Sequence, residues 1–106
     1  MKDKKEMPRR NPQTDLLVRV LLALETPDEC YQLLDDLCTI SEVQAMAQRI
    51  EVARLLREQI TYQEIAGATG ASTATISRVN RCLTYGSDGY TTVLNRITAE
   101  GMEGKA

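Results

Sequence analysis

Two helix-start signals separated by a glycine constrain the fold of this chain more than any other feature of its sequence. Residues 61–64, Thr-Tyr-Gln-Glu, have the pattern of a capping box, in which threonine and glutamate satisfy free N–H groups at a helix start. Gly70 tolerates the left-handed conformation that ends a helix, and Ser72 is suited to cap a second one. The pattern predicts two short helices joined by a tight turn, a helix-turn-helix over about residues 62–83.

The apolar residues of this segment are spaced so that the two helices can cross. Ala66 is small enough for the second helix to pass closely over the first, while Ile76 and Val79 are expected to hold the crossing. Packing these side chains inward leaves the opposite face of the second helix free. That face carries small, hydroxyl and basic side chains: Thr73, Ala74, Ser77, Arg78 and Arg81. No acidic residue occurs in residues 65–87, so a phosphate-facing surface is possible there.

The free face predicts binding to double-stranded DNA. Small and hydroxyl side chains let a helix enter the major groove, where threonine can meet a thymine methyl and arginine can bind guanine or phosphate. The predicted DNA-binding residues lie on both helices and at the turn: Gln63, Ser72, Thr73, Ala74, Thr75, Ser77, Arg78 and Arg81. The alternative interpretation is an ordinary helical hairpin whose polar face is merely solvated.

The composition favours an all-α protein. Of 106 residues 42% are hydrophobic, but only 4% are aromatic and there is no Phe or Trp. A core built from Leu, Ile, Val, Ala and Met suits helix packing better than a sheet. We expect one helical domain over residues 14–97, between a mobile basic arm (1–13) and a flexible tail (98–106).

The segment from Leu16 to Leu24 leaves little polar face, which a surface helix of a small monomer could hardly tolerate. A second chain is the natural cover, because a domain of this size has few other elements to offer. We therefore expect a homodimer.

Two more helix starts lie between this segment and the helix-turn-helix. Thr26 is followed by Pro27 and by Glu29, which predicts a capped helix. Thr39 or Ser41 is expected to cap the next helix. These helices are interpreted as the scaffold of the domain.

Several function classes are disfavoured by what the sequence lacks. A formal net charge of -2 argues against a protein that coats nucleic acid by charge alone. The three cysteines form no Cys-x-x-Cys pair and there is no histidine, so no metal site is expected and the thiols are expected to be reduced. No apolar run is long enough to span a membrane, and a cytoplasmic location is expected. The chain lacks a glycine-rich phosphate loop and a nucleophile elbow, so it is not expected to be an enzyme.

At this point the sequence resembles the tryptophan repressor superfamily, and within it the group of tryptophan-repressor-related proteins. Residues 70–78, Gly-Ala-Ser-Thr-Ala-Thr-Ile-Ser-Arg, are similar to the repressor's Gly-Ala-Gly-Ile-Ala-Thr-Ile-Thr-Arg. Thr39-x-Ser41-Glu42, residues 48–50 (Gln-Arg-Ile) and residues 85–90 extend the resemblance over about residues 37–97. The resemblance implies an intertwined all-helical homodimer in which the N-terminal helices of both chains form one core.

The resemblance also suggests a site for a small-molecule corepressor. In the family two arginines hold tryptophan, and Arg49 and Arg78 fall at the matching places if one gap is allowed between the two blocks. The repressor has glycine after the second arginine, whereas this chain has Val79, whose side chain would occupy the space of an indole. With Cys82 these residues form the candidate ligand-binding set. Tryptophan is a doubtful ligand, and either another small molecule or none is expected.

Basic side chains on the first helix of the motif are few compared with the repressor. Gln63 and Gly67 stand where the repressor has basic or amide side chains, and Ala66 replaces a lysine. Arg54 and Arg57 on the preceding helix are candidates to replace these phosphate contacts. Because this surface has few basic side chains, a second function stays open: a protein-interaction module that retains the helix-turn-helix without binding DNA.

Overall fold

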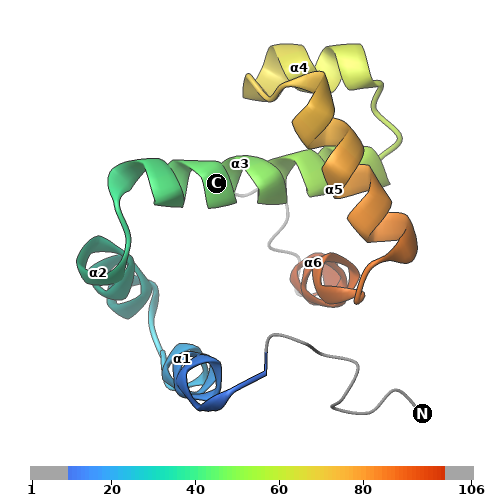
Figure 1. The fold of residues 1–106 in the computed structure, drawn as a ribbon. Coiled ribbons are helices and arrows are strands. Elements are labelled where there is room, and N and C mark those ends of the chain that lie inside the picture. Colours follow the sequence, from blue (N-terminus) through green and yellow to red (C-terminus); the bar gives the residue numbers. More distant parts are fainter. Residues whose placement is uncertain (1–9, 100–106) are drawn as a thin grey trace. The chain divides into compact units, whose positions relative to one another are not determined.

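The computed structural model describes residues 10–99, and in this part of the chain all regular secondary structure is helical, with no strand. Its six helices are α1 (Pro12–Leu22), α2 (Pro27–Leu37), α3 (Ile40–Arg57), α4 (Tyr62–Thr69), α5 (Thr73–Tyr85) and α6 (Gly89–Ala99) (Figure 1). The predicted all-α class is confirmed. Within residues 10–99 no helix is long and apolar enough to cross a membrane.

The chain divides into two compact units at the boundary between Thr39 and Ile40. The N-terminal unit contains α1 and α2, and the C-terminal unit contains α3 to α6. Most of the expected basic arm and most of the expected tail lie outside the described residues. Within them, α1 begins at Pro12, two residues before the expected start of the domain, and α6 ends at Ala99, two residues after its expected end.

The N-terminal unit shows why its two helices begin where they do. The Asn11 Oδ1 accepts a hydrogen bond from the Thr14 N–H at 2.9 Å, and Pro12 needs no partner at the first helical position. The predicted cap at Thr26 is confirmed, because its Oγ1 accepts the Glu29 N–H at 3.1 Å. The Glu29 carboxylate accepts the N–H of Glu25 at 2.8 Å, one residue before the position that a standard capping box uses.

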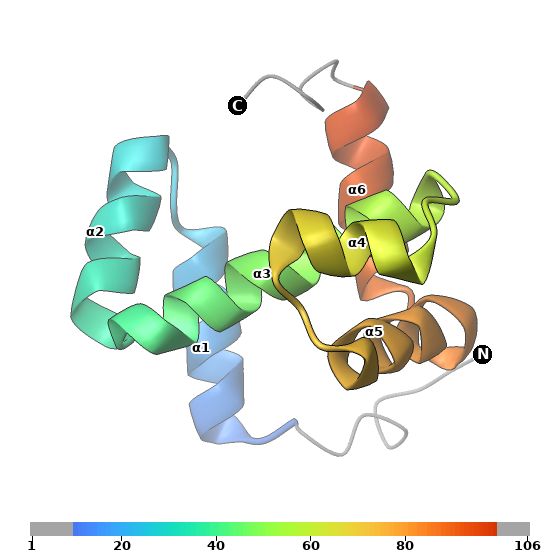
Figure 2. The ribbon, with the colours of Figure 1, turned by 90° about the horizontal axis from the view of Figure 1, so that it is seen from above.

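The C-terminal unit is organised around α3, which contacts α4, α5 and α6, while α4 and α5 also contact each other (Figures 1 and 2). Helix α3 begins at Ile40, so the residue immediately before the helix is Thr39, and Ser41 lies within it. The buried hydrophobic residues of the described chain all belong to this unit: Val52, Ala53, Ile65, Ala71, Ile76, Val79 and Leu94. The core therefore lies where α4, α5 and α6 meet α3.

Helix α6 was not among the helices predicted from the sequence. Residues 85–90, which lead from the end of α5 into α6, enter the sequence analysis only through the family resemblance. The spacing of Tyr90, Val93, Leu94 and Ile97 does fit one face of a helix. Leu94 from this face enters the core, with 3% of its surface exposed.

Candidate nucleic-acid interface

The backbone from Thr61 to Tyr85 forms the two capped helices and tight turn predicted from the sequence. The Thr61 Oγ1 accepts the Glu64 N–H at 3.2 Å, and the Ser72 Oγ accepts the Thr75 N–H at 3.1 Å. Gly70 ends α4 with a φ of 76°, the left-handed conformation that its lack of a side chain permits. Helix α5 then continues to Tyr85, two residues beyond the expected end.

The turn between α4 and α5 is held by hydrogen bonds of its own residues. The Thr69 hydroxyl donates to the Ile65 carbonyl at 2.8 Å and accepts the Ala71 N–H at 3.1 Å. The Gly70 N–H donates to the Ala66 carbonyl at 2.9 Å. Because Ala71 is buried in the core, the turn is attached to the interior of the unit at the point where α5 begins.

Helix α5 separates a buried face from an exposed one. Ile76 and Val79 are buried, as their predicted role in the helix crossing requires. The predicted base-facing and phosphate-facing residues are exposed: Thr73, Ala74, Ser77, Arg78 and Arg81. Their spacing places them along one side of α5, and no acidic residue interrupts it. The structure therefore brings together the α5 part of the predicted site.

The remaining predicted contacts have more varied surroundings. Gln63 is exposed in the first turn of α4. Ser72 is exposed but caps α5, and its hydroxyl lies 3.1 Å from the hydroxyl of half-buried Thr75. These two residues are thus already engaged in holding the start of the helix.

Two arginines of α3 that were candidates for phosphate contacts are engaged within the unit. Arg54 forms ion pairs with Glu51 at 2.6 Å and with Glu58 at 3.0 Å. The Arg57 guanidinium donates to the side-chain oxygen of Asn95 on α6. The Arg54 guanidinium, by hydrogen bonding and by its charge, holds the pKa of the Glu51 carboxyl below its ordinary value, although partial burial acts in the opposite direction. The structure thus gives these arginines roles inside the protein that the sequence did not reveal.

The four candidate ligand-binding residues do not share one environment. Val79 is buried in the core with 1% of its surface exposed, and Arg49 is half-buried. Arg78 and Cys82 are exposed on α5. The predicted occupation of core space by the Val79 side chain agrees with this arrangement.

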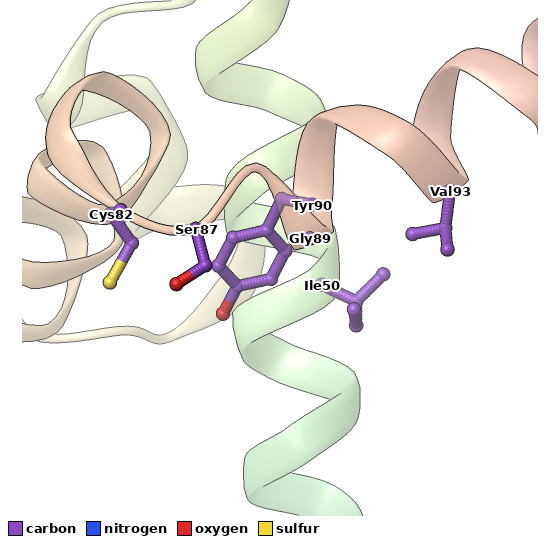
Figure 3. Close-up of a pocket in the computed structure, with 7 residues that line it drawn as sticks. Ile50, Cys82, Ser87, Gly89, Tyr90 and Val93 are labelled. Atoms are coloured by element: carbon purple, nitrogen blue, oxygen red, sulfur yellow. The ribbon is translucent and has the colours of Figure 1, made fainter. Parts of the chain in front are cut away.

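A hollow of about 460 Å³ lies beside Cys82 (Figure 3). Its lining comes from α3, the end of α5, the connecting loop and α6: Ile50, Cys82, Gly86, Ser87, Gly89, Tyr90 and Val93. Cys82 is the candidate ligand residue in this lining, which does not include Arg49, Arg78 or Val79. Figure 3 shows the Cys82 thiol and the Ser87 hydroxyl toward one end, and Ile50 and Val93 toward the other.

The α5–α6 loop, which lines part of this hollow, has a tightly constrained backbone. The Gly86 N–H donates to the Cys82 carbonyl at 2.9 Å. A Cβ at Gly86 would lie 2.5 Å from that carbonyl oxygen, so a larger residue could not keep this path. Asp88 adopts a φ of 69° before α6 begins. Sequence reasoning missed this loop as a structural feature, although Gly86 within it and Gly89 directly after it were a signal.

The described cysteines, Cys30, Cys38 and Cys82, are free thiols. Within residues 10–99 no group of three His, Cys, Asp or Glu side chains is placed to hold a metal ion.

Comparisons with known proteins identify the family. The family model described as Trp repressor protein matches residues 12–98. The uncharacterized protein YerC of Bacillus subtilis strain 168 is 56% identical over 88 residues, which cover 83% of this chain and 85% of that protein. A TrpR like protein from Eubacterium eligens ATCC 27750 has a solved structure that is 49% identical, with a TM-score of 0.81 over 84% of this chain and 92% of that one.

A second solved structure, from Staphylococcus aureus, is of a protein described as a candidate Trp repressor. It is 44% identical, with a TM-score of 0.83, and covers 92% of this chain and 96% of that one. The match in sequence and the matches in structure thus each cover most of this chain. The chain belongs to the Trp repressor family.

Proposed function

We propose that this protein is a dimeric, sequence-specific DNA-binding transcription regulator, acting as a repressor, in which α5 reads the major groove. The exposed, acid-free face of α5 carries the proposal. Its small side chains allow close approach to base edges, and Arg78 and Arg81 supply positive charge beside them. Membership of the Trp repressor family supports the same function.

The proposal gives the residues of this face different roles. Thr73 and Ala74, at the start of α5, read base edges, where a methyl group can contact thymine. Ser77 and Arg78 lie one turn further along the same side, and Arg81 mainly holds phosphate. From α4, the side-chain amide of Gln63 contacts the sugar-phosphate backbone of DNA. Ser72 and Thr75 hold the start of α5, the end of the helix that enters the major groove.

Dimerisation is the second part of the proposal, and it rests on the N-terminal unit. Neither α1 nor α2 contains a buried residue. Leu16, Leu21 and Leu22 of α1 are 55%, 46% and 80% exposed, which is costly for leucines in water. A second copy of the chain is the proposed cover. It would also present two α5 helices to DNA with twofold symmetry.

A corepressor, if the protein uses one, is proposed to be a small molecule other than tryptophan. The Val79 side chain is packed in the core at the position where the resemblance requires room for an indole. A close-packed interior cannot hold a valine and an aromatic ring in the same volume.

Selection of genomic DNA fragments by the purified full-length protein, with and without metabolite extracts, tests the function. We expect an enriched inverted repeat with half-sites about 34 Å apart, because two α5 helices of a symmetric dimer enter successive major grooves. Enriched sites without dyad symmetry would contradict the proposed geometry. Failure to retain any fragment at low salt would favour the interaction module instead.

The variant Arg81→Ala tests the phosphate contact separately. We expect weaker binding to all sequences alike and a salt slope reduced by roughly one unit, since one phosphate contact fewer releases about one counterion fewer. Arg96→Ala removes an exposed arginine from α6 and is the matched control. An unchanged salt slope for Arg81→Ala would remove this residue from the interface.

A further inference from the structure

We propose that Gln48 of α3 is a positioning residue that sets the placement of the α4–α5 turn and, through it, the base-reading start of α5. This inference rests on the proposed DNA-binding function. Its observation is a hydrogen bond from the Gln48 Nε2 to the Thr69 carbonyl oxygen at 3.2 Å. The two residues are 21 positions apart, and the bond is partly buried.

The bonded carbonyl is one that the helix itself cannot satisfy. Thr69 is the last residue of α4, and the last four carbonyls of a helix lack intrahelical partners. The Ala66 carbonyl in this turn is satisfied by the Gly70 N–H, but the Thr69 carbonyl receives its bond from a different helix. Loss of that donor would leave a partly buried acceptor unpaired, which is more costly than the bond itself is favourable.

The same hydrogen bond also holds the α4–α5 turn in position relative to α3. Thr69 contributes its carbonyl to Gln48 and its hydroxyl to the Ala71 N–H. Ala71 is buried in the core, and Ser72 immediately afterwards caps α5. Through Thr69, Gln48 therefore connects the central helix α3 to the turn in which Ala71 and Ser72 set the start of α5.

Different parts of α5 depend on this connection to different degrees. Ile76 and Val79 hold the middle of α5 against the unit by packing in the hydrophobic core. Thr73 and Ala74 directly follow the turn, whereas Arg81 lies two helical turns further along. Loss of the Gln48 bond should displace the base-reading end more than the phosphate-holding end. Sequence discrimination should then fall while the salt dependence stays.

The test compares Gln48→Met and Gln48→Glu with wild type. Methionine keeps the length of the side chain and removes the amide, while ionised glutamate keeps the shape and removes the donor. Gln44→Met is the matched control, because Gln44 lies one turn earlier on α3 and is exposed. The readouts are the ratio of affinities for the selected site and for random DNA, the salt slope, and the backbone amide NMR shifts of residues 69–74.

We expect both Gln48 variants to lower the specific-to-random affinity ratio by roughly fivefold to tenfold, as the loss of one partly buried hydrogen bond allows. The salt slope should stay within the error of wild type, and the amide shifts of residues 69–74 should move. Gln44→Met should leave the ratio within about twofold.

A ratio for Gln48→Met within twofold of wild type, with unmoved amide shifts, would overturn the inference. So would a parallel fall in specific and random affinity, because sequence discrimination would then be unchanged. If the wild type binds no DNA at all, the proposed function fails, and the inference about DNA reading fails with it. In that case the amide shifts still decide whether Gln48 positions the turn.

Discussion

The two compact units of this protein use their apolar side chains in opposite ways. In the C-terminal unit, Ile65 and Ile76 are completely buried, and the core is closed by residues of the same chain. In the N-terminal unit no residue of α1 or α2 is buried, although α1 is rich in leucine and valine. Burial of apolar surface stabilises a fold by about 25 cal/mol per Å². The C-terminal unit thus supplies its own core, whereas the N-terminal unit leaves its apolar surface exposed, where the proposed dimer would cover it.

The difference in burial fits the proposed roles of the two units, DNA reading by the C-terminal unit and dimerisation by the N-terminal unit. A surface that reads DNA must be held rigidly, because side chains that meet base edges tolerate little displacement. The closed core beneath α5 meets that requirement. An open apolar unit is instead suited to build a dimer interface, since cover by a second chain converts its exposed leucines into a shared core.

The largest expected effect comes from a charge placed on the apolar surface of the N-terminal unit. Leu21→Asp places a charge on α1 where the proposed dimer buries an apolar surface, at a cost on the order of 3–5 kcal/mol. We expect dissociation or unfolding, measured by sedimentation velocity and circular dichroism. Gln13→Asp, at an exposed position of the same helix, is the control. A wild-type protein that sediments as a stable monomer at micromolar concentration would refute the dimer.

The next effect concerns the closed core of the C-terminal unit. Val79→Gly removes a buried side chain and adds a glycine inside α5, at a cost of about 2–3 kcal/mol in the free energy of unfolding. The cavity should also allow measurable tryptophan binding, whereas we expect negligible binding by the wild type. Calorimetric titration of both proteins measures it. Tight binding of tryptophan by the wild type would show that Val79 does not block an indole.

A smaller effect is expected in the loop between α5 and α6, where it tests how little space the backbone leaves for a side chain at Gly86. Gly86→Ala brings a Cβ to 2.5 Å from the Cys82 carbonyl oxygen, so the link between α5 and α6 must shift. We expect roughly 1–2 kcal/mol of destabilisation in thermal or urea unfolding. Gly89→Ala meets open space and is the matched control. Equal stability of the two variants would show that this loop is not tightly constrained.

The smallest effect separates surface electrostatics from packing in the C-terminal unit. The pKa of Glu51 is lowered by Arg54, so the charged form is favoured in the folded state. Its contribution is present above the ordinary pKa of a glutamate and is lost as the pH falls through the lower folded value. Because this pair is partly exposed, we expect less than about 0.5 kcal/mol.

Thermal unfolding between pH 3 and pH 7, roughly the range over which carboxylates titrate, checks this expectation. The stability difference between wild type and Glu51→Gln should shrink as the pH falls. Asp36→Asn, at an exposed position of α2, is the control. A difference that grows toward acid would mean that the sign assigned to Glu51 is wrong.

Local signals were sufficient to predict the helix starts of α4 and α5. Thr61 and Ser72 cap their helices through side chains only three residues from their partners, and Gly70 acts through its own backbone. Such interactions are encoded within a few residues, so reading the chain locally finds them. The inward position of Ile76 and Val79 followed from helical spacing for the same reason.

Contacts between residues far apart in the sequence could not be predicted in this way. Arg57 meets Asn95 across 38 positions, and Gln48 meets Thr69 across 21. The hollow beside Cys82 combines Ile50 of α3 with residues of the α5–α6 loop and α6. No local pattern specifies these pairs, because each depends on how complete helices pack.

The sequence by itself determined the all-helical class, the caps, the glycine turn and the acid-free face of α5, because these features follow from short-range hydrogen bonding and periodicity. The tertiary structure decided which charged side chains remain available. Packing brought Arg54 and Arg57 against partners within the unit and left Arg78 and Arg81 exposed. The physical reason is that availability depends on three-dimensional neighbours, which packing alone establishes.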